Sequence, residues 1–231
     1  MENENLTKFI KDNFKKSYVI NLDRRSDRYK DFCESLPFDY NIVERFSATD
    51  GTILQRTDGN LGEIGCHISH KRLLEIITND ENIKDEDLIL ILEDDVFFNN
   101  TFYLDFKYAI DMYNKLKKNI NSVLYVGGRF HEDFVPANFP HGWKKLDENF
   151  FLRNKNTKLI LNQNKNRGTF ILIFNKFIIR KLFNSLKNVG ENVPIDLHYN
   201  MFFEQNSDID FYEMFPHICY SPLDYKSDII R

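Results

Sequence analysis

The feature that most constrains the fold is Leu88–Leu92 (LILIL), a run of five apolar residues without a polar interruption. Such a run is typical of a strand that is covered on both faces. Segments with strand and helix patterns alternate on either side of it, which predicts an α/β fold with a mostly parallel central sheet and helices on both faces. The other expected strands are Ser17–Leu22, Asn41–Phe46, Ser122–Val126 and Thr169–Phe174, and the expected helices are Arg25–Leu36, Gly62–Thr78, Phe102–Lys118, Lys176–Lys187 and one that begins near Pro194.

We expect one domain over residues 1–231, because no internal repeat or low-complexity linker divides the chain and 42% of its residues are hydrophobic. The charged residues 1–16 are expected to form an N-terminal extension of this domain. His131–Asn149 is expected to be an irregular loop, with two prolines and the only tryptophan. A loop of this length in a compact domain is more often functional, so we expect it to line or cover a site.

Charge and cysteine content exclude several classes of function. A formal net charge of −4 with dispersed lysines leaves no broad basic surface for a nucleic-acid backbone. The three cysteines are widely spaced and form no CxxC, which fits neither a disulfide framework nor a thiolate zinc site. No stretch reaches the apolar length needed to span a bilayer. We therefore expect a soluble protein of a reducing, cytoplasmic compartment, without a nucleic-acid partner or a transmembrane segment.

Three consecutive acids, Glu93-Asp94-Asp95, directly follow the apolar run. Ligands of such folds bind beyond the carboxyl ends of the strands, where these acids fall. Their charges repel one another and favour a compensating cation. Oxygen ligands suit Mg²⁺ or Mn²⁺, which complete their coordination with water and substrate phosphate. The alternative is that the acids cap a following helix and face water.

Seven blocks along the chain form a recognisable series: VINLDRRSDR (Val19–Arg28), FSATDG (Phe46–Gly51), GEIGCHISHKRLL (Gly62–Leu74), LILEDDV (Leu90–Val96), GTFILIFNKFIIRKL (Gly168–Leu182), VPIDLH (Val193–His198) and SDI (Ser227–Ile229). In this order they resemble glycosyltransferase family 25, which includes bacterial lipopolysaccharide galactosyltransferases and collagen galactosyltransferase domains. The chain departs from the family at Phe170-Ile171-Leu172, where His-Ala-Tyr is common.

The resemblance implies a GT-A-type, Rossmann-like fold and an inverting transfer from a UDP-sugar donor that depends on Mn²⁺ or Mg²⁺. It implies metal contacts at Asp94 and Asp95, with Asp228 as a further candidate. The acceptor would be a glycan or protein hydroxyl, such as a lipopolysaccharide sugar or a hydroxylysine, and galactose is expected before glucose or N-acetylglucosamine. The residues expected to contact the nucleotide-sugar are Asn21, Arg24, Arg28, Asp50, Gly51, Glu93 and Thr169.

Some of these residues have a second interpretation. The arginines of RRSDR could form a solvated helix face with intrahelical ion pairs, and Thr49-Asp50-Gly51 is also an ordinary turn sequence. An inverting transfer needs a base that is separate from the metal acids and within reach of the attacking hydroxyl. We assign this role to Asp196, for which the alternative is an acid at a helix N-terminus that stabilises the helix dipole.

His67 and His70 lie three residues apart beside Cys66, a spacing that could offer two zinc ligands on one helix. No nearby pattern of acids or cysteines completes such a site, so we expect structural roles, with His70 bound to a backbone carbonyl and Cys66 in the core. Near the C-terminus, His217 and Asp224 could also return to the metal or the diphosphate.

Two other classes of function stay open. One is a non-catalytic domain that binds a sugar nucleotide or serves as a scaffold. The other is a metal-dependent phosphoesterase built on the same acids, which would usually need further Asp and His residues for a second metal. The sequence contains one dense cluster of acids, the triplet Glu93-Asp94-Asp95 at the end of the apolar strand.

Overall fold

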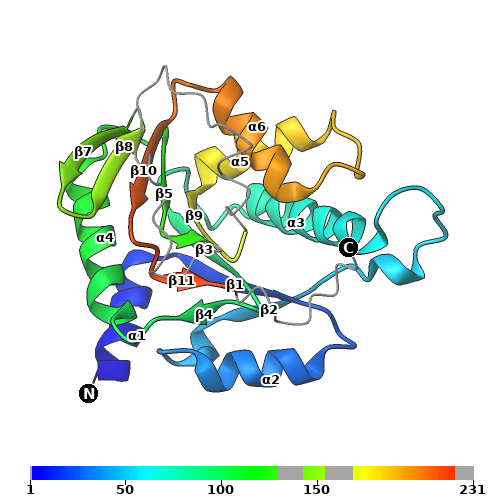
Figure 1. The fold of residues 1–231 in the computed structure, drawn as a ribbon, viewed down its shortest axis with the longest axis horizontal. Coiled ribbons are helices and arrows are strands. Elements are labelled where there is room, and N and C mark those ends of the chain that lie inside the picture. Colours follow the sequence, from blue (N-terminus) through cyan, green and yellow to red (C-terminus); the bar gives the residue numbers. More distant parts are fainter. Residues whose placement is uncertain (1, 129–142, 154–168, 222–231) are drawn as a thin grey trace.

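The computed structural model describes residues 2–128, 143–153 and 169–221. Its main element is an eight-stranded sheet in the order β2-β1-β3-β9-β5-β10-β8-β7 (Figure 1). The pairings make β9 and β8 run opposite to the other strands. The strands are β1 (Lys16–Asn21), β2 (Glu44–Ser47), β3 (Leu88–Glu93), β5 (Ser122–Tyr125), β7 (Trp143–Asp147), β8 (Phe150–Arg153), β9 (Ile171–Asn175) and β10 (Asp210–Met214).

Helices cover both faces of this sheet, which confirms the predicted α/β fold class (Figure 1). The run Leu88–Leu92 is divided between the two faces. Its three leucines pack in one core cluster with α1, α2 and α4, and its two isoleucines pack in another with α3, α5 and α6. All five are at most 6% exposed, so the strand is buried from both sides as its composition predicts. The helices are α1 (Glu2–Asn13), α2 (Ser26–Ser35), α3 (Leu61–Asn79), α4 (Phe102–Leu116), α5 (Lys176–Leu186) and α6 (Ile195–Gln205).

Strand β9 departs from a wholly parallel arrangement, because it lies antiparallel between β3 and β5. Leu92, near the end of β3, is paired with Ile171, at the start of β9. The Glu93 amide donates to the carbonyl of Phe170 at 3.0 Å. The antiparallel direction therefore brings Thr169, which precedes β9, to the edge where the acidic triplet lies. A parallel β9 would have put Thr169 at the opposite edge.

The described part of the expected N-terminal extension, residues 2–16, contains α1 and the start of β1. Leu6 and Ile10 of α1 are each 1% exposed and belong to the same core cluster as Phe14. The spacing of four residues places Leu6 and Ile10 on one face of α1, and Phe14 follows directly after the helix, so this otherwise polar segment packs against the domain.

Two other segments differ from the sequence prediction. The strand expected at Asn41–Phe46 is replaced by a short 3-10 helix, η1 (Tyr40–Ile42), and by β2, which begins at Glu44. Within the loop expected at His131–Asn149, the part that the structure describes is β7 and the turn that leads to β8. These strands extend the sheet because β8 pairs with β10 through Tyr212 and Leu152.

A small second sheet, in the order β4-β11-β6, lies beside the end of β3. Its strands are β4 (Phe97–Phe98), β6 (Gly127–Gly128) and β11 (Cys219–Tyr220). It brings Ser221 close to Asp95, 126 positions earlier in the chain.

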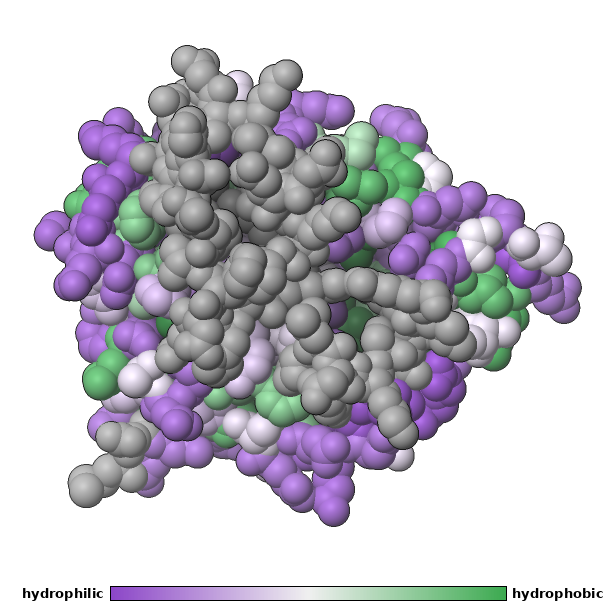
Figure 2. Space-filling model, viewed as in Figure 1, coloured by the Kyte–Doolittle hydropathy of each residue, from purple (hydrophilic) through white to green (hydrophobic). Residues whose placement is uncertain are grey.

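On the face seen in Figure 2, hydrophilic residues predominate around the margin of the molecule. The exposed large hydrophobic side chains include Ile53 at 76% and Leu104 at 67%, and these two come from elements far apart in the sequence. Among the described helices, none is both long enough and apolar enough to cross a bilayer.

Candidate active site

The acidic triplet lies in an open cavity at the carboxyl ends of β1 and β3, with about 680 Å³ of space when the adjoining solvent is included. The parallel register pairs Ile20 with Glu93, so the residues that follow the two strands meet at one edge. The other walls come from the 3-10 helix η2 (Gly51–Ile53) and the start of α3. Seven of the residues predicted as donor or metal contacts line this cavity: Arg24, Arg28, Asp50, Gly51, Glu93, Asp94 and Asp95.

The approach of α3 to the Asp50 segment requires two glycines. A Cβ on Gly65 would lie 2.7 Å from both the Gly51 nitrogen and the Thr49 carbonyl oxygen, and one on Gly51 would lie 1.6 Å from the Leu61 carbonyl oxygen. No side chain fits at either position. The backbone nitrogen of Thr49 also donates to the hydroxyl of Ser69 on α3 at 2.8 Å. The motifs FSATDG and GEIGCHISH are therefore joined by direct backbone packing.

Asp94 is held by residues of β1 and α2. Asn21 Nδ2 donates to Asp94 Oδ2 at 2.5 Å, and the buried guanidinium of Arg28 forms an ion pair with Asp94 Oδ1. Arg28 Nη2 also lies 3.4 Å from Asp95 Oδ2. The alternative interpretation of the arginines as a solvated helix face is therefore wrong for Arg28, which is 6% exposed and partly neutralises the triplet.

Asn21, predicted to contact the nucleotide-sugar, has its amide fully engaged within the protein. Nδ2 donates to the Arg25 carbonyl and to Asp94, while Oδ1 accepts from Nε and Nη2 of Arg45 at 2.9 and 2.6 Å. These bonds use both amide protons and both lone pairs of the oxygen. Asn21 thus orients Asp94 in this structure, and its contact with a nucleotide-sugar stays a prediction.

Arg24 and Asp50 form an ion pair on the rim of the cavity, with Arg24 Nε 2.6 Å from Asp50 Oδ2. Asp50 Oδ1 accepts from the Thr52 amide and hydroxyl, so Asp50 caps η2. Partial burial would raise the pKa of Asp50, but the bonds from Thr52 and Arg24 lower it overall. Asp50 therefore presents a negative charge beside an exposed arginine at the cavity mouth.

The negative charges of Glu93 and Asp95 are compensated less completely than that of Asp94, which pairs directly with Arg28. Burial alone would raise the pKa of Glu93, but hydrogen bonds and charge from His70, with the Thr169 hydroxyl, lower it overall. Burial, and then the charge of Glu93, raise the pKa of Asp95 to about 7. Ser221 Oγ donates to Asp95 Oδ2 at 3.3 Å, whereas Oδ1 is buried without a hydrogen-bond partner among the described residues. A cation bound beside Asp95 would therefore stabilise its ionised form.

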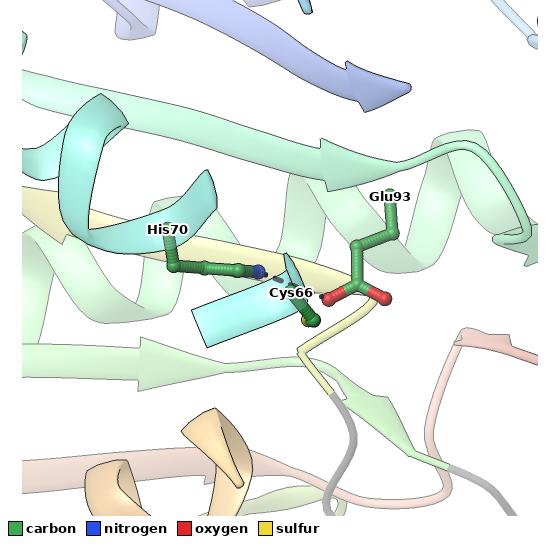
Figure 3. Close-up of side chains that lie close together, drawn as sticks. All are labelled: Cys66, His70 and Glu93. Atoms are coloured by element: carbon green, nitrogen blue, oxygen red, sulfur yellow. Dashed lines mark hydrogen bonds and ion pairs between the residues drawn. The ribbon is translucent and has the colours of Figure 1, made fainter. Parts of the chain in front are cut away.

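His70 points from α3 toward Glu93, with Cys66 one helical turn away (Figure 3). His70 Nε2 lies 3.2 Å from Glu93 Oε1 and Nδ1 lies 3.2 Å from the Tyr199 hydroxyl. The expectation that His70 binds a backbone carbonyl is wrong, and it is His67 that does so, through the Val193 oxygen at 2.8 Å. Burial, and then the charges of Glu93 and other acids, hold the pKa of the Cys66 thiol well above its usual range.

Asp196 lies in the first turn of α6 and lines a small second cavity of about 20 Å³. Its Oδ1 accepts from the Leu197 amide at 2.8 Å. Thr169 lines the same cavity and donates its hydroxyl to Glu93, so this threonine contacts both the acidic triplet and the surroundings of Asp196. The charge of Asp196 also acts on Cys66. The candidate base is therefore close to the triplet but separate from it.

Of the C-terminal candidates, Asp224 and Asp228 lie outside the described residues. His217 is bound within the protein, with Nε2 3.0 Å from Glu213 Oε1, and Glu213 is 1% exposed at the end of β10. No pattern in the sequence predicts this pair, because Glu213 lies in an apolar segment without a motif around it.

Residues 14–199, well over half of the chain, match the profile of the family described as glycosyltransferase family 25 (LPS biosynthesis protein). A search of curated proteins finds no match.

Proposed function

The chain belongs to glycosyltransferase family 25, and on this premise we propose that it transfers a hexose from a UDP-sugar to an acceptor hydroxyl with inversion at the anomeric carbon. The observation that carries the proposal is Asp95, a cavity-lining carboxylate with one buried oxygen lacking a partner among the described residues. A donor bearing a diphosphate and a divalent cation would supply the missing charge.

Several observations support the cavity as the donor site. Its lining joins the acidic triplet with Arg24, Arg28 and Asp50, so carboxylates and guanidinium groups face one space. Arg24 is exposed at its rim, and a guanidinium can bind phosphate oxygens through two parallel hydrogen bonds. The Asp50 carboxylate beside it is an acceptor for a ribose hydroxyl or a base N–H.

The residues present fit a hard divalent cation, Mn²⁺ or Mg²⁺. Asp95 Oδ1 is the available ligand among the described acids. Asp94 is less suitable as a direct ligand because Arg28 and Asn21 engage its two oxygens. Asp228 stays a prediction as a further ligand. Such a cation would stabilise the departing diphosphate electrostatically.

The remaining chemistry falls to residues of the chain itself. The acceptor oxygen attacks the anomeric carbon, the bond from that carbon to the diphosphate oxygen breaks, and UDP leaves. The Asp196 carboxylate takes the proton of the acceptor hydroxyl. Thr169 holds Glu93 in place for the donor sugar. An α-linked donor would give a β-linked product, with galactose as the first sugar to test.

The acceptor that we propose is a hydroxyl of a glycan of the lipopolysaccharide type, which follows the description of the matching family. A hydroxylysine-type protein acceptor is the second choice.

A donor screen by thermal unfolding tests the proposal without knowledge of the acceptor. Chelated protein is mixed with UDP-galactose, UDP-glucose or UDP-N-acetylglucosamine, each with and without Mn²⁺. A donor at 100 times its Kd should stabilise the protein by about 2.7 kcal/mol. Asp95→Ala should abolish the Mn²⁺-dependent shift, whereas Asp111→Ala, which removes an exposed pair on α4, should retain it.

Product analysis follows with the donor that binds best. Release of UDP together with a new glycosidic bond is expected, whereas phosphate release without that bond would assign a phosphoesterase. If no UDP-sugar shifts the unfolding temperature and no UDP is released, the proposal is wrong.

A further inference from the structure

Cys66, His70 and Glu93 offer one ligand atom each, and these three atoms lie within 4.8 Å of one another. The cluster is assembled by the fold, since the cysteine and the histidine come from one face of α3 and the glutamate from the end of β3 (Figure 3). Among the described residues it is the group of His, Cys, Asp and Glu side chains that meets this spacing.

We propose that Cys66, His70 and Glu93 form a site for a zinc-type divalent cation, distinct from the oxygen-ligated cation of the donor site. A thiolate and an imidazole favour Zn²⁺ or Co²⁺ over Mn²⁺ and Mg²⁺, which prefer oxygen ligands. The thiol gives its proton to solvent when the metal binds. With one thiolate, one carboxylate and one neutral imidazole, the ligand charges balance the two positive charges of the cation.

The geometry requires little movement. In a tetrahedral zinc site the nitrogen and oxygen ligands lie about 3.3 Å apart, and the sulfur lies about 3.6 Å from each of them, as follows from the usual bond lengths. The observed distance between His70 Nε2 and Glu93 Oε1 is 3.2 Å. The separation of ligand atoms, at most 4.8 Å, leaves about 1 Å for the sulfur to cover by side-chain rotation.

Contacts around the cluster hold two of the ligands in orientation. The Tyr199 hydroxyl lies 3.2 Å from His70 Nδ1 and can accept a hydrogen bond from Nδ1–H, which leaves Nε2 for the metal. The Thr169 hydroxyl donates to Glu93 Oε1. Cys66, His70 and Glu93 also line the open cavity of the acidic triplet, so the fourth position is accessible from the cavity to water or a ligand.

Co²⁺ titration of the full chain after chelation tests this site. We expect one equivalent to produce a thiolate-to-cobalt charge-transfer band in the near ultraviolet, which Zn²⁺ abolishes and equimolar Mn²⁺ does not. Cys66→Ser should remove the band, His70→Gln should weaken binding at least tenfold, and Cys33→Ser on α2 should leave the band unchanged. Absence of the band, its persistence in Cys66→Ser, or its loss with equimolar Mn²⁺ would overturn the proposal.

A second measurement uses the unmodified protein, so its result does not depend on whether a variant folds. Zn²⁺ should slow the alkylation of Cys66 by iodoacetamide at least fivefold, followed by peptide mass spectrometry, while Cys33 reacts at the same rate. Equal rates for Cys66 with and without Zn²⁺ would refute the site. Neither experiment depends on donor or acceptor, so the donor-site proposal can fail separately.

Discussion

Replacement of Asp95 by Asn should change how the stability of the metal-free protein depends on pH. Asp95 has a pKa of about 7 in the folded chain, compared with 3.8 for an ordinary aspartate. Because the folded-state pKa is raised, the folded protein binds the proton more tightly than the unfolded chain does. The ionised carboxylate therefore destabilises the fold increasingly as pH rises from 3.8, and this effect is complete above about pH 7.

The magnitude follows from the width of that window. Between pH 5 and pH 7 the wild-type protein should lose about 2 kcal/mol relative to Asp95→Asn, because the slope of about 1.4 kcal/mol per pH unit falls as the folded-state pKa is approached. Asn keeps the shape of the side chain but has no proton to lose, so the variant lacks this contribution. The variant also loses the ion pair with Arg28. Above about pH 7, where Asp95 is ionised, this loss lowers the stability of the variant by an amount that does not change with pH.

Urea unfolding with chelator at pH 5, 6, 7 and 8 measures this difference through far-ultraviolet circular dichroism. Asp111→Asn on the exposed face of α4 is the matched control, and its difference from the wild type should be flat with pH in this range. A difference between wild type and Asp95→Asn that stays constant within about 0.5 kcal/mol would refute the reasoning. Saturating Mn²⁺ and donor should restore the stability of the wild type and leave the variant unchanged.

Three further predictions address other parts of the site. Asp196→Asn should lower kcat by about 10² to 10⁴ while the affinity for the donor is unchanged, as measured by UDP release and donor titration; a kcat near that of the wild type would exclude Asp196 as the base. Arg28→Met should destabilise the chain by about 3–5 kcal/mol in urea unfolding, because the buried Asp94 carboxylate loses its cation; unchanged stability would contradict this account. Gly65→Ala should cost about 1–3 kcal/mol and weaken donor binding, since the added Cβ meets the Asp50 segment. Gly190→Ala, where a Cβ meets nothing within 4 Å, is its control, and equal stability of the two variants would count against the packing argument.

The sequence by itself determined the layers of the fold and the edge at which the site lies. A strand such as Leu88–Leu92 has no polar side, so any stable fold must cover both of its faces. The acids that follow it must then lie at the strand end, where ligands of such folds bind. These conclusions rest on local periodicity, which a sequence displays directly.

The tertiary structure decided which side chains meet at that edge. The pairing of Arg28 with Asp94, and of Ser221 with Asp95, joins segments far apart in the chain, and no local pattern specifies such partners. The antiparallel insertion of β9, which brings Thr169 to Glu93, was likewise not readable from β9 itself, because a doubly buried strand has the same composition in either direction. Periodicity reports whether a residue is buried, whereas strand direction and side-chain partners follow from long-range packing.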